Sequence, residues 1–372
     1  MADEQFLAEA LEERMRADAL RSLRHESGLI DFCSNDYLGM AADEGFRQQL
    51  QQELLNLDLP LGSTGSRLLS GAHPELDRCE SQLAAWYDAE TALLFNSGYD
   101  ANLGLFSCIA QRGDTLLYDQ YIHASIRDAV RLSHATAHRF RHNDLEDLEQ
   151  RLRRSAGRVF VSVESVYSMD GDLAPLQELS TLCQRYEAHL LVDEAHGFGV
   201  FGPQGCGRVQ ELGLQQQVLA RLHTFGKALG LHGAALLGSS LLKEYLINFS
   251  RPLIYTTAMP AGHAYAIARA HGYLRTLEDR RSRLQSLIGH FRNMPLLVPR
   301  IESQSPIQPL LIPGNSRARA LAEHLRSCGL DVRAILPPTV AAGSERLRVV
   351  LHSFNSTGQL EELQAGLEAF SA

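Results

Sequence analysis

The stretch RVFVSVESVYSMDGDLAPLQELSTLCQRYEAHLLVDE, residues 158–194, carries the pattern that decides the fold. Two short, continuous apolar runs, 158–164 and 189–194, are typical of buried strands. Between them, residues 175–187 have the apolar spacing of a helix. Because short apolar strands that alternate with helices usually pair in parallel, the segment predicts part of a parallel sheet.

The same alternation extends in both directions along the chain. It predicts further strands at 91–95, 115–119, 220–224 and 233–239, and further helices at 74–87, 100–111, 123–132 and 144–154. We therefore expect an α/β fold with a mostly parallel central sheet and helices on both faces. Ligands of such folds bind at the carboxyl ends of the strands, so polar residues that follow strands are the candidate site residues.

The pattern changes after residue 265. Long helices precede a smaller α+β segment, whose strands are predicted at 307–312 and 346–352. We expect three parts, namely an N-terminal helix and segment (1–45), a large domain (46–265) and a small C-terminal domain (266–372).

Composition narrows the class of protein. The chain has 372 residues, of which 45% are hydrophobic and 21% charged, and its formal net charge is −9. This is ordinary for a globular protein with a large core, and no basic block favours a nucleic-acid partner. The N-terminus is acidic and amphipathic, and no apolar run reaches membrane-spanning length, so we expect a cytoplasmic protein. The six cysteines form no C-x-x-C pair, which favours reduced thiols.

Two motif-like segments do not carry the function that they suggest. VDEAH at 192–196 resembles a helicase motif, but the phosphate-binding loop that a helicase needs is absent. GFGVFG at 197–202 matches G-x-G-x-x-G, the motif of dinucleotide-binding sites, but it does not open a helix. The acidic residue that should follow such a motif, here Asp193, precedes it instead.

The spacing of His134, His138 and His142 by four residues does not predict a metal site. The segment 137–141 alternates like a strand, and this would point the three rings in different directions.

Lys227 lies among glycines and small apolar residues in TFGKALG, residues 224–230. A partly desolvated lysine is a nucleophile toward carbonyl groups, although most lysines are solvated. Asp193 ends a predicted buried strand, where a carboxylate needs a cationic partner or a structural ion pair. A protonated pyridine nitrogen is such a partner. A Schiff-base lysine and an acid beside the pyridine ring are what pyridoxal phosphate chemistry requires.

Other residues fit the same cofactor. The backbone of residues 96–99, NSGY, lies between a predicted strand and a helix, where N–H groups bind phosphate. His123 is a candidate to stack on the cofactor ring, and Ser168 and His196 are candidates to bind its phenolic oxygen. Ordinary turn-stabilising roles are the alternative for these polar residues.

The motifs of the whole chain, in order, resemble those of the α-oxoamine synthases, pyridoxal-phosphate enzymes of the aspartate-aminotransferase fold. The motifs are SNDYLG (34–39), GSTGSRLLSGAHPEL (62–76), FNSGYDAN (95–102), ESVYSMDGD (164–172), VDEAHGFGVFGPQGCG (192–207), TFGKALG (224–230) and IYTTAMP (254–260).

This resemblance implies a role for each candidate residue. Lys227 would form the Schiff base and move protons at the substrate Cα, Asp193 would pair with the pyridinium, and His123 would stack on the ring. The remaining cofactor contacts would be Gly98, Tyr99, Ser168, His196 and Thr224, together with Thr257 from a partner subunit. The substrate contacts would be Arg21, Asn35, His123, Thr339 and Arg348.

The resemblance also implies the reaction and the partners. Members of this family join an amino acid to an acyl thioester with loss of CO₂, as homodimers. The C-terminal segment resembles the branch that uses L-alanine and a pimeloyl thioester of CoA or of acyl carrier protein. Sister branches that use glycine or serine are the alternatives, as is a non-catalytic scaffold subunit, which would lack Lys227.

The sequence departs from the pattern of that branch in two places. Leu336 stands before Pro337 where the branch has an arginine, and Leu231–His232 replace smaller residues. A different acyl thioester is therefore a further hypothesis.

Overall fold

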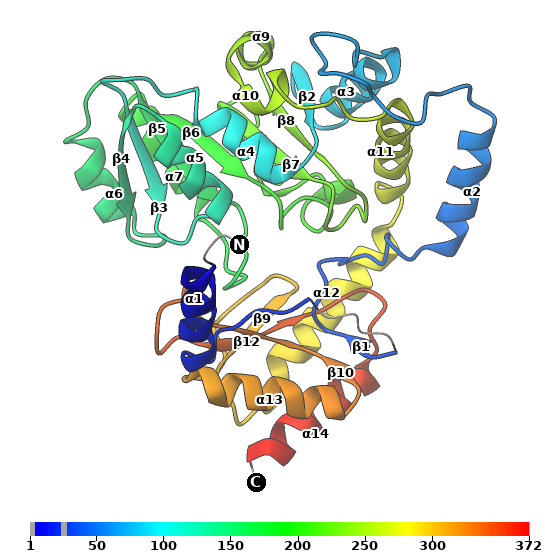
Figure 1. The fold of residues 1–372 in the computed structure, drawn as a ribbon, viewed down its shortest axis with the longest axis vertical. Helices are drawn as coiled ribbons and strands as arrows, with labels where there is room; N and C mark the ends of the chain where they lie inside the picture. The colour runs from blue at the N-terminus through cyan, green and yellow to red at the C-terminus, as the bar shows by residue number, and fades with distance from the viewer. Residues whose placement is uncertain (1–3, 24–27, 372) are drawn as a thin grey trace. The chain divides into compact units, whose positions relative to one another are not determined.

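The computed structural model describes residues 4–23 and 28–371. The chain divides into two compact units (Figure 1), which we consider separately. The larger unit comprises residues 38–168 and 173–281. The smaller unit comprises residues 1–37, 169–172 and 282–372. The three-part division expected from the sequence, with bounds at 45 and 265, stays a prediction.

A seven-stranded sheet forms the centre of the larger unit, among the described residues (Figure 1). Its order is β2-β8-β7-β6-β5-β3-β4, and β8 is antiparallel to both of its neighbours. The expected α/β fold with a mostly parallel sheet is confirmed. The strands are β2 (Thr91–Phe95), β3 (Thr115–Asp119), β4 (Thr136–Phe140), β5 (Val159–Glu164), β6 (His189–Asp193), β7 (Ala220–Thr224) and β8 (Ala234–Gly238).

Helices cover both faces of this sheet. Neighbouring strand residues point to opposite faces. Leu191 therefore packs into one apolar core cluster, with Leu105 and Ile126, while Leu190 packs into the other. The helices of this unit are α2 (Glu44–Leu55), α3 (Pro74–Trp86), α4 (Gly98–Phe106), α5 (Ala124–Leu132), α6 (Leu145–Leu152), α7 (Leu176–Arg185), the 3₁₀ turn η1 (Pro203–Gly205), α8 (Arg208–Glu211), α9 (Ser240–Phe249), α10 (Arg251–Ile254) and α11 (Ala261–Leu274).

Local sequence determines where several of these helices begin. Ser97 caps α4, since its side chain accepts a hydrogen bond from the Asp100 N–H at 3.0 Å. Asp43 caps α2 in the same way through the Phe46 N–H. The sequence pattern did not predict α2 because Phe46 is its single buried residue, so the helix has almost no apolar face.

The smaller unit is built on antiparallel strands in the order β11-β12-β9, with β1 and β10 paired in parallel. Its strands are β1 (Ile30–Asp31), β9 (Ile307–Leu311), β10 (Leu330–Asp331), β11 (Arg333–Ile335) and β12 (Arg346–Val350). Its helices are α1 (Gln5–Arg16), α12 (Glu278–Asn293), most of which lies in this unit, α13 (Asn315–Ser327) and α14 (Thr357–Ser371).

Two contacts tie the short segment 169–172 into the smaller unit. The Asp170 carboxylate pairs with Arg346 on β12. The Ser303 hydroxyl donates to the Gly171 carbonyl oxygen at 2.8 Å.

Over residues 4–23 and 28–371, no helix is both long enough and apolar enough to cross a membrane. Within the same ranges, no group of three or more His, Cys, Asp or Glu residues is placed to bind a metal ion.

Candidate active site

The carboxyl ends of three neighbouring strands meet at one edge of the larger sheet. Glu164 at the end of β5 and Asp193 at the end of β6 are register partners, so their side chains leave the sheet on the same face. Thr224 ends β7, and the loop that follows it contains Lys227. Lys227 is half-buried, and its carbonyl oxygen accepts the Gly230 N–H at 2.8 Å. The fold therefore brings together residues that the sequence analysis selected separately.

Asp193 is buried and receives two hydrogen bonds. Its Oδ2 accepts from Nδ2 of Asn102 on α4 at 2.9 Å, and its Oδ1 accepts from the Ala195 N–H at 2.9 Å. These two donors fix the orientation of the Asp193 carboxylate. Asn102 was not predicted as a site residue, although it lies in the motif FNSGYDAN.

The first turn of α4 offers a place for an anion. Ser97 already accepts from the N–H groups of Asp100 and Ala101, whereas the first N–H groups of the helix, at Gly98 and Tyr99, have no intrahelical acceptor. A Cβ atom at Gly98 would lie 2.4 Å from Cγ2 of Thr224, so a glycine is needed for this approach. A helix N-terminus with open N–H groups suits a phosphate.

Thr224 contributes a second indication of a ligand-binding site. Its Oγ1 is buried and has no hydrogen-bond partner within the described part of the chain. Buried hydroxyl groups are nearly always hydrogen-bonded, so this atom is suited to a bound group such as a phosphate. Tyr99, in contrast, donates its hydroxyl to Asp128 at 2.6 Å, and this bond raises the pKa of Tyr99.

His123 caps helix α5 at the same edge of the sheet. Its Nδ1 accepts the Ser125 N–H at 3.2 Å and lies 2.8 Å from the Ser125 hydroxyl. Desolvation lowers the pKa of His123, the negative charge of Asp193 opposes this, and the positive charge of Lys227 adds to it. The imidazole is therefore neutral near pH 7.

Glu164 is a buried carboxyl group that the sequence analysis missed. One of its oxygens, Oε2, accepts the Ser168 N–H at 3.2 Å, and the other has no partner among the residues described. Burial raises the pKa of Glu164 well above its ordinary value, and the charge of Asp193 raises it further. The signal was present, because the strand 158–164 ends in a carboxylate just as 189–194 does.

The other predicted cofactor residues also lie in the larger unit. Ser168 follows β5 and His196 follows β6, and both are buried. Thr257 has an exposed side chain, while its carbonyl oxygen accepts from Nδ2 of Asn96 at 2.9 Å.

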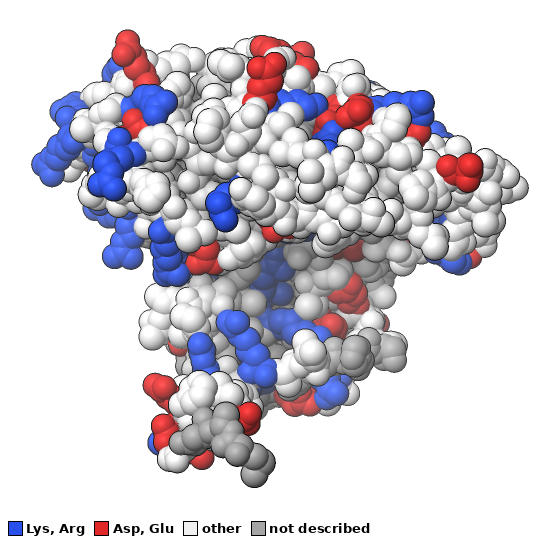
Figure 2. Space-filling view, turned by 45° about the horizontal axis from the view of Figure 1, so that its top comes forward, with Lys and Arg blue, Asp and Glu red and all other residues white. Residues whose placement is uncertain are grey.

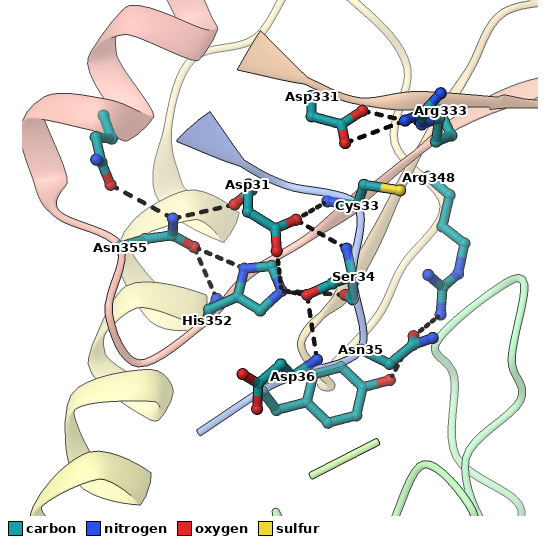
Figure 3. Close-up of polar contacts among 12 residues, drawn as sticks. Asp31, Cys33, Ser34, Asn35, Asp36, Asp331, Arg333, Arg348, His352 and Asn355 are labelled. Carbon is teal, nitrogen blue, oxygen red and sulfur yellow. Dashed lines mark hydrogen bonds and ion pairs between the residues drawn. The ribbon is translucent and has the colours of Figure 1, made fainter. Parts of the chain in front are cut away.

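The smaller unit brings together Asn35 and Arg348 (Figure 3). Arg348 on β12 donates from Nη2 to Oδ1 of Asn35 at 2.9 Å, and the Tyr37 hydroxyl donates to the same oxygen at 3.2 Å. Burial raises the pKa of Tyr37 to about 12, although the Arg348 charge opposes this. Tyr37 therefore remains a neutral donor that fixes the Asn35 amide.

A network of hydrogen bonds holds the turn that carries Asn35 (Figure 3). Asp31 accepts the N–H groups of Cys33 and Ser34, each at 2.8 Å. Burial would raise the pKa of Asp31, but the His352 charge and the bonds from Ser34 and Cys33 outweigh it, so the pKa is lowered. The turn is thus built around an ionised carboxylate.

The remaining two predicted substrate contacts also meet in the smaller unit. Nη2 of Arg21 lies 3.5 Å from the hydroxyl oxygen of Thr339. All substrate candidates except His123 therefore belong to the smaller unit, and all cofactor candidates belong to the larger one.

Comparison with known proteins gives the class of this protein. The family model for aminotransferase class I and II matches residues 27–367. The chain therefore belongs to the class I and II aminotransferase family, whose members share this mostly parallel α/β fold and use pyridoxal phosphate.

Curated relatives narrow the class further. The 8-amino-7-oxononanoate synthase of Cellvibrio japonicus is 44% identical over 90% of this chain and 84% of its own length. The 8-amino-7-oxononanoate synthase of Marinobacter nauticus is 40% identical over 97% of this chain and 95% of its own length. Within the family, this chain groups with these pyridoxal-phosphate-dependent C-acyltransferases of biotin biosynthesis.

Solved structures agree with this assignment. The serine palmitoyltransferase of Sphingomonas wittichii matches with a TM-score of 0.88 and 32% identity, over 99% of this chain and 96% of its own. The 8-amino-7-oxononanoate synthase of Francisella tularensis matches with a TM-score of 0.78 and 29% identity, over 93% and 98%. A serine palmitoyltransferase with bound pyridoxal phosphate has a TM-score of 0.88 and 28% identity, over 99% and 97%.

The residues of the larger unit fit this cofactor. The Thr224 hydroxyl, which has no partner among the described residues, and the open turn at Gly98 suit its phosphate, and the buried Asp193 carboxylate suits its ring nitrogen.

Proposed function

We propose that this protein condenses L-alanine with a pimeloyl thioester of CoA or of acyl carrier protein, with loss of CO₂ and release of the thiol, to give 8-amino-7-oxononanoate. The observation that carries the proposal is the cluster of Asp193, Lys227 and Thr224 at the ends of β6 and β7, beside the open first turn of α4. The names of the sequence relatives supply the substrates.

In this proposal the larger unit holds the cofactor. The backbone at Gly98 and Tyr99 and the Thr224 hydroxyl bind the phosphate, and Asp193 pairs with the ring nitrogen. Ser168 and His196 contact the phenolic oxygen, and His123 stacks on the ring. When bound, pyridoxal phosphate supplies an electron sink for the negative charge that develops at the substrate Cα.

Lys227 is the proposed proton carrier. With the amino acid bound, its Nζ would remove the proton from the substrate Cα and later return one to the product. Its half-buried position supports this role because water competes less for the amine there. Asp193 would assist by placing its carboxylate beside the ring nitrogen, since a negative partner favours the protonated form of that nitrogen.

The smaller unit is proposed to hold the amino acid. Arg348 presents a planar fork of N–H donors that matches a carboxylate, and it is already oriented by Asn35. Arg21 and Thr339 are proposed to make further contacts with the substrate.

We also propose that the protein acts as a homodimer in the cytoplasm. Exposed large apolar side chains in the larger unit, Leu61, Leu69 and Tyr255 among them, support a subunit contact. Figure 2 shows wide areas without charged side chains on the face that it draws. The exposed side chain of Thr257 is then free to reach a cofactor in the second subunit. The free thiols of all six cysteines support a reducing compartment.

A visible absorption titration tests the proposal. The purified protein, supplied with pyridoxal phosphate, should show a cofactor band that is absent from Lys227→Ala. L-Alanine should shift the band at lower concentration than glycine or L-serine does. If glycine or L-serine acts at the lowest concentration, the protein belongs to a sister branch. If the wild-type protein forms no band at all, the cofactor assignment fails.

The acyl donor requires a separate comparison, because Leu336 departs from the arginine expected there. We expect turnover with pimeloyl-CoA to exceed turnover with an uncharged acyl-CoA of equal chain length. Equal or reversed rates would indicate a different acyl donor.

A further inference from the structure

A continuous chain of hydrogen bonds joins Asp193 to His123 in the larger unit. Nδ2 of Asn102 donates to Oδ2 of Asp193 at 2.9 Å and lies 3.0 Å from Oγ of Ser125. Oγ of Ser125 lies 2.8 Å from Nδ1 of His123. Neither Asn102 nor Ser125 was predicted as a site residue, yet Asn102 is 2% and Ser125 1% exposed. Two buried polar side chains thus connect the proposed ring-nitrogen partner to the proposed stacking residue.

The direction of every bond in this chain follows from its two ends. A carboxylate oxygen of Asp193 accepts, so the atom of Asn102 that faces it is the amide nitrogen. The same nitrogen has a second hydrogen, and Oγ of Ser125 is the acceptor within reach. Because that oxygen accepts from Asn102, its own hydrogen is available for Nδ1 of His123.

The His123 end of this chain of hydrogen bonds gives the same bond directions independently. The backbone N–H of Ser125 lies 3.2 Å from Nδ1 of His123 and can only donate. Nδ1 must therefore be an acceptor, so in the neutral imidazole the proton is on Nε2. Two donors directed at Nδ1 also disfavour its protonation, which agrees with the lowered pKa of His123.

We propose that Asn102 and Ser125 are positioning residues that link Asp193 to His123 and hold the imidazole as its Nε2–H tautomer. The proposal rests on the proposed function, in which Asp193 and His123 lie at the cofactor. Its consequence is that Nε2 of His123 is a hydrogen-bond donor throughout turnover. That donor suits an acceptor oxygen of the substrate, such as a carboxylate or a thioester carbonyl.

The first test measures the tautomer without relying on catalysis. Full-length protein with ¹⁵N-labelled histidine is examined by NMR with and without pyridoxal phosphate, and the His123 signals are assigned by their loss in His123→Gln. Wild-type protein should carry the proton on Nε2 in both states. Ser125→Ala should lower the ratio of Nε2–H to Nδ1–H about fivefold or more, because one of the two donors to Nδ1 is lost.

Ser180→Ala is the matched control. Ser180, in helix α7, is equally buried and donates its hydroxyl to Oε1 of Gln217 at 2.7 Å. This variant should lose stability comparably and leave the His123 tautomer unchanged. Ser125→Thr, which keeps the hydroxyl, should retain the wild-type tautomer ratio if it folds, as judged by its unfolding temperature.

The second test examines the other end of the chain. Asn102→Asp places a second carboxyl group beside Asp193, so the pair shares a proton and presents less charge to the ring nitrogen. Pyridoxal phosphate should bind at least tenfold more weakly. In Ser125→Ala, kcat should fall, while KM for the amino acid should change little.

Three results overturn the proposal. These are a wild-type His123 with its proton on Nδ1, a tautomer ratio that Ser125→Ala leaves unchanged, and unaltered cofactor affinity in Asn102→Asp. Failure of the proposed function looks different, because the wild-type protein would then show no cofactor band while the NMR result could still stand.

Discussion

Arg348 and Asn35, which lie near opposite ends of the chain, share a hydrogen bond of 2.9 Å in the smaller unit. The bond constrains a guanidinium that would otherwise lose much side-chain entropy when a substrate orders it. A site that orders its arginine in advance binds a carboxylate at a lower entropic cost.

Arg348→Lys should therefore impair binding of the amino acid more than chemistry. An ammonium group cannot reproduce the two-point contact of a guanidinium with a carboxylate. We expect KM for L-alanine to rise about ten- to hundredfold, the equivalent of one charged hydrogen bond, with a smaller change in kcat. Steady-state kinetics checks this. Arg333→Lys is the control, since Arg333 pairs with Asp331 in the same unit and should leave KM near its wild-type value.

Gly98→Ala should weaken binding of pyridoxal phosphate about ten- to hundredfold, because the new Cβ would lie 2.4 Å from Cγ2 of Thr224. Thr224→Ser in the same chain removes Cγ2 and keeps the hydroxyl, so the double variant should recover most of the affinity. Equilibrium titration of the cofactor measures both. Gly262→Ala, with no atom nearer than 3.8 Å to its Cβ, should bind normally. A double variant no better than Gly98→Ala would contradict the steric explanation.

Asp193→Asn and Glu194→Gln should show that these two adjacent carboxylates have different roles. Asp193→Asn removes the proposed partner of the ring nitrogen, and kcat should fall at least about 100-fold. Glu194 instead accepts the Val209 N–H at 3.0 Å and lies 3.4 Å from Nε2 of His223. Glu194→Gln should therefore lower the unfolding temperature and leave cofactor affinity nearly unchanged. Similar effects of the two variants on affinity would argue against this division of roles.

Glu164→Gln should change how stability depends on pH. Burial and the Asp193 charge raise the pKa of Glu164, while the Lys227 charge and the N–H groups of Ser168 and His123 oppose them. The folded state therefore holds this proton more tightly than the unfolded chain does. The contribution of the protonated Glu164 carboxyl group to stability is complete below the ordinary pKa of a carboxyl group. It is lost as the pH rises through the pKa of Glu164 in the folded state.

The glutamine variant stays neutral at every pH. Wild-type protein should thus lose stability relative to Glu164→Gln as the pH rises from about 5 to about 8, as measured by urea midpoints. Glu345→Gln provides a control of opposite sign. The Gly314 N–H is the main cause that lowers the pKa of Glu345, so the wild-type advantage over this variant should be lost on acidification. A pH-independent difference for Glu164→Gln would disprove the prediction.

Much of the larger unit could be predicted from local sequence. The continuous apolar runs at 159–164 and 189–193 are strands because both of their faces are buried, and burial of both faces is what such runs indicate. Asp193 and Lys227 could be selected from the sequence as candidate site residues because a carboxylate after a buried strand and a lysine among glycines are each costly without a partner. In contrast, β10 and β11 are too short to show a period.

The residues whose roles could not be predicted from local sequence make their contacts with residues that are distant in the chain. In the sequence, Asn102 cannot be told from an ordinary helix residue. Its contacts with Ser125 and Asp193 form only after α4, α5 and β6 have packed together. The same holds for Asn35, whose partner Arg348 looks like any strand-surface arginine until the smaller unit has formed.

The pairing of β1 with β10 also sets an order of events during synthesis. Ile30 leaves the ribosome long before its strand partner Leu330 has been translated, by roughly 15 to 60 s at 5 to 20 residues per second. Until then the turn with Asn35 has nothing to dock against, although every residue of the larger unit has already emerged. The nascent chain thus completes the proposed cofactor-binding residues before the proposed amino-acid-binding residues, although Asn35 is translated early.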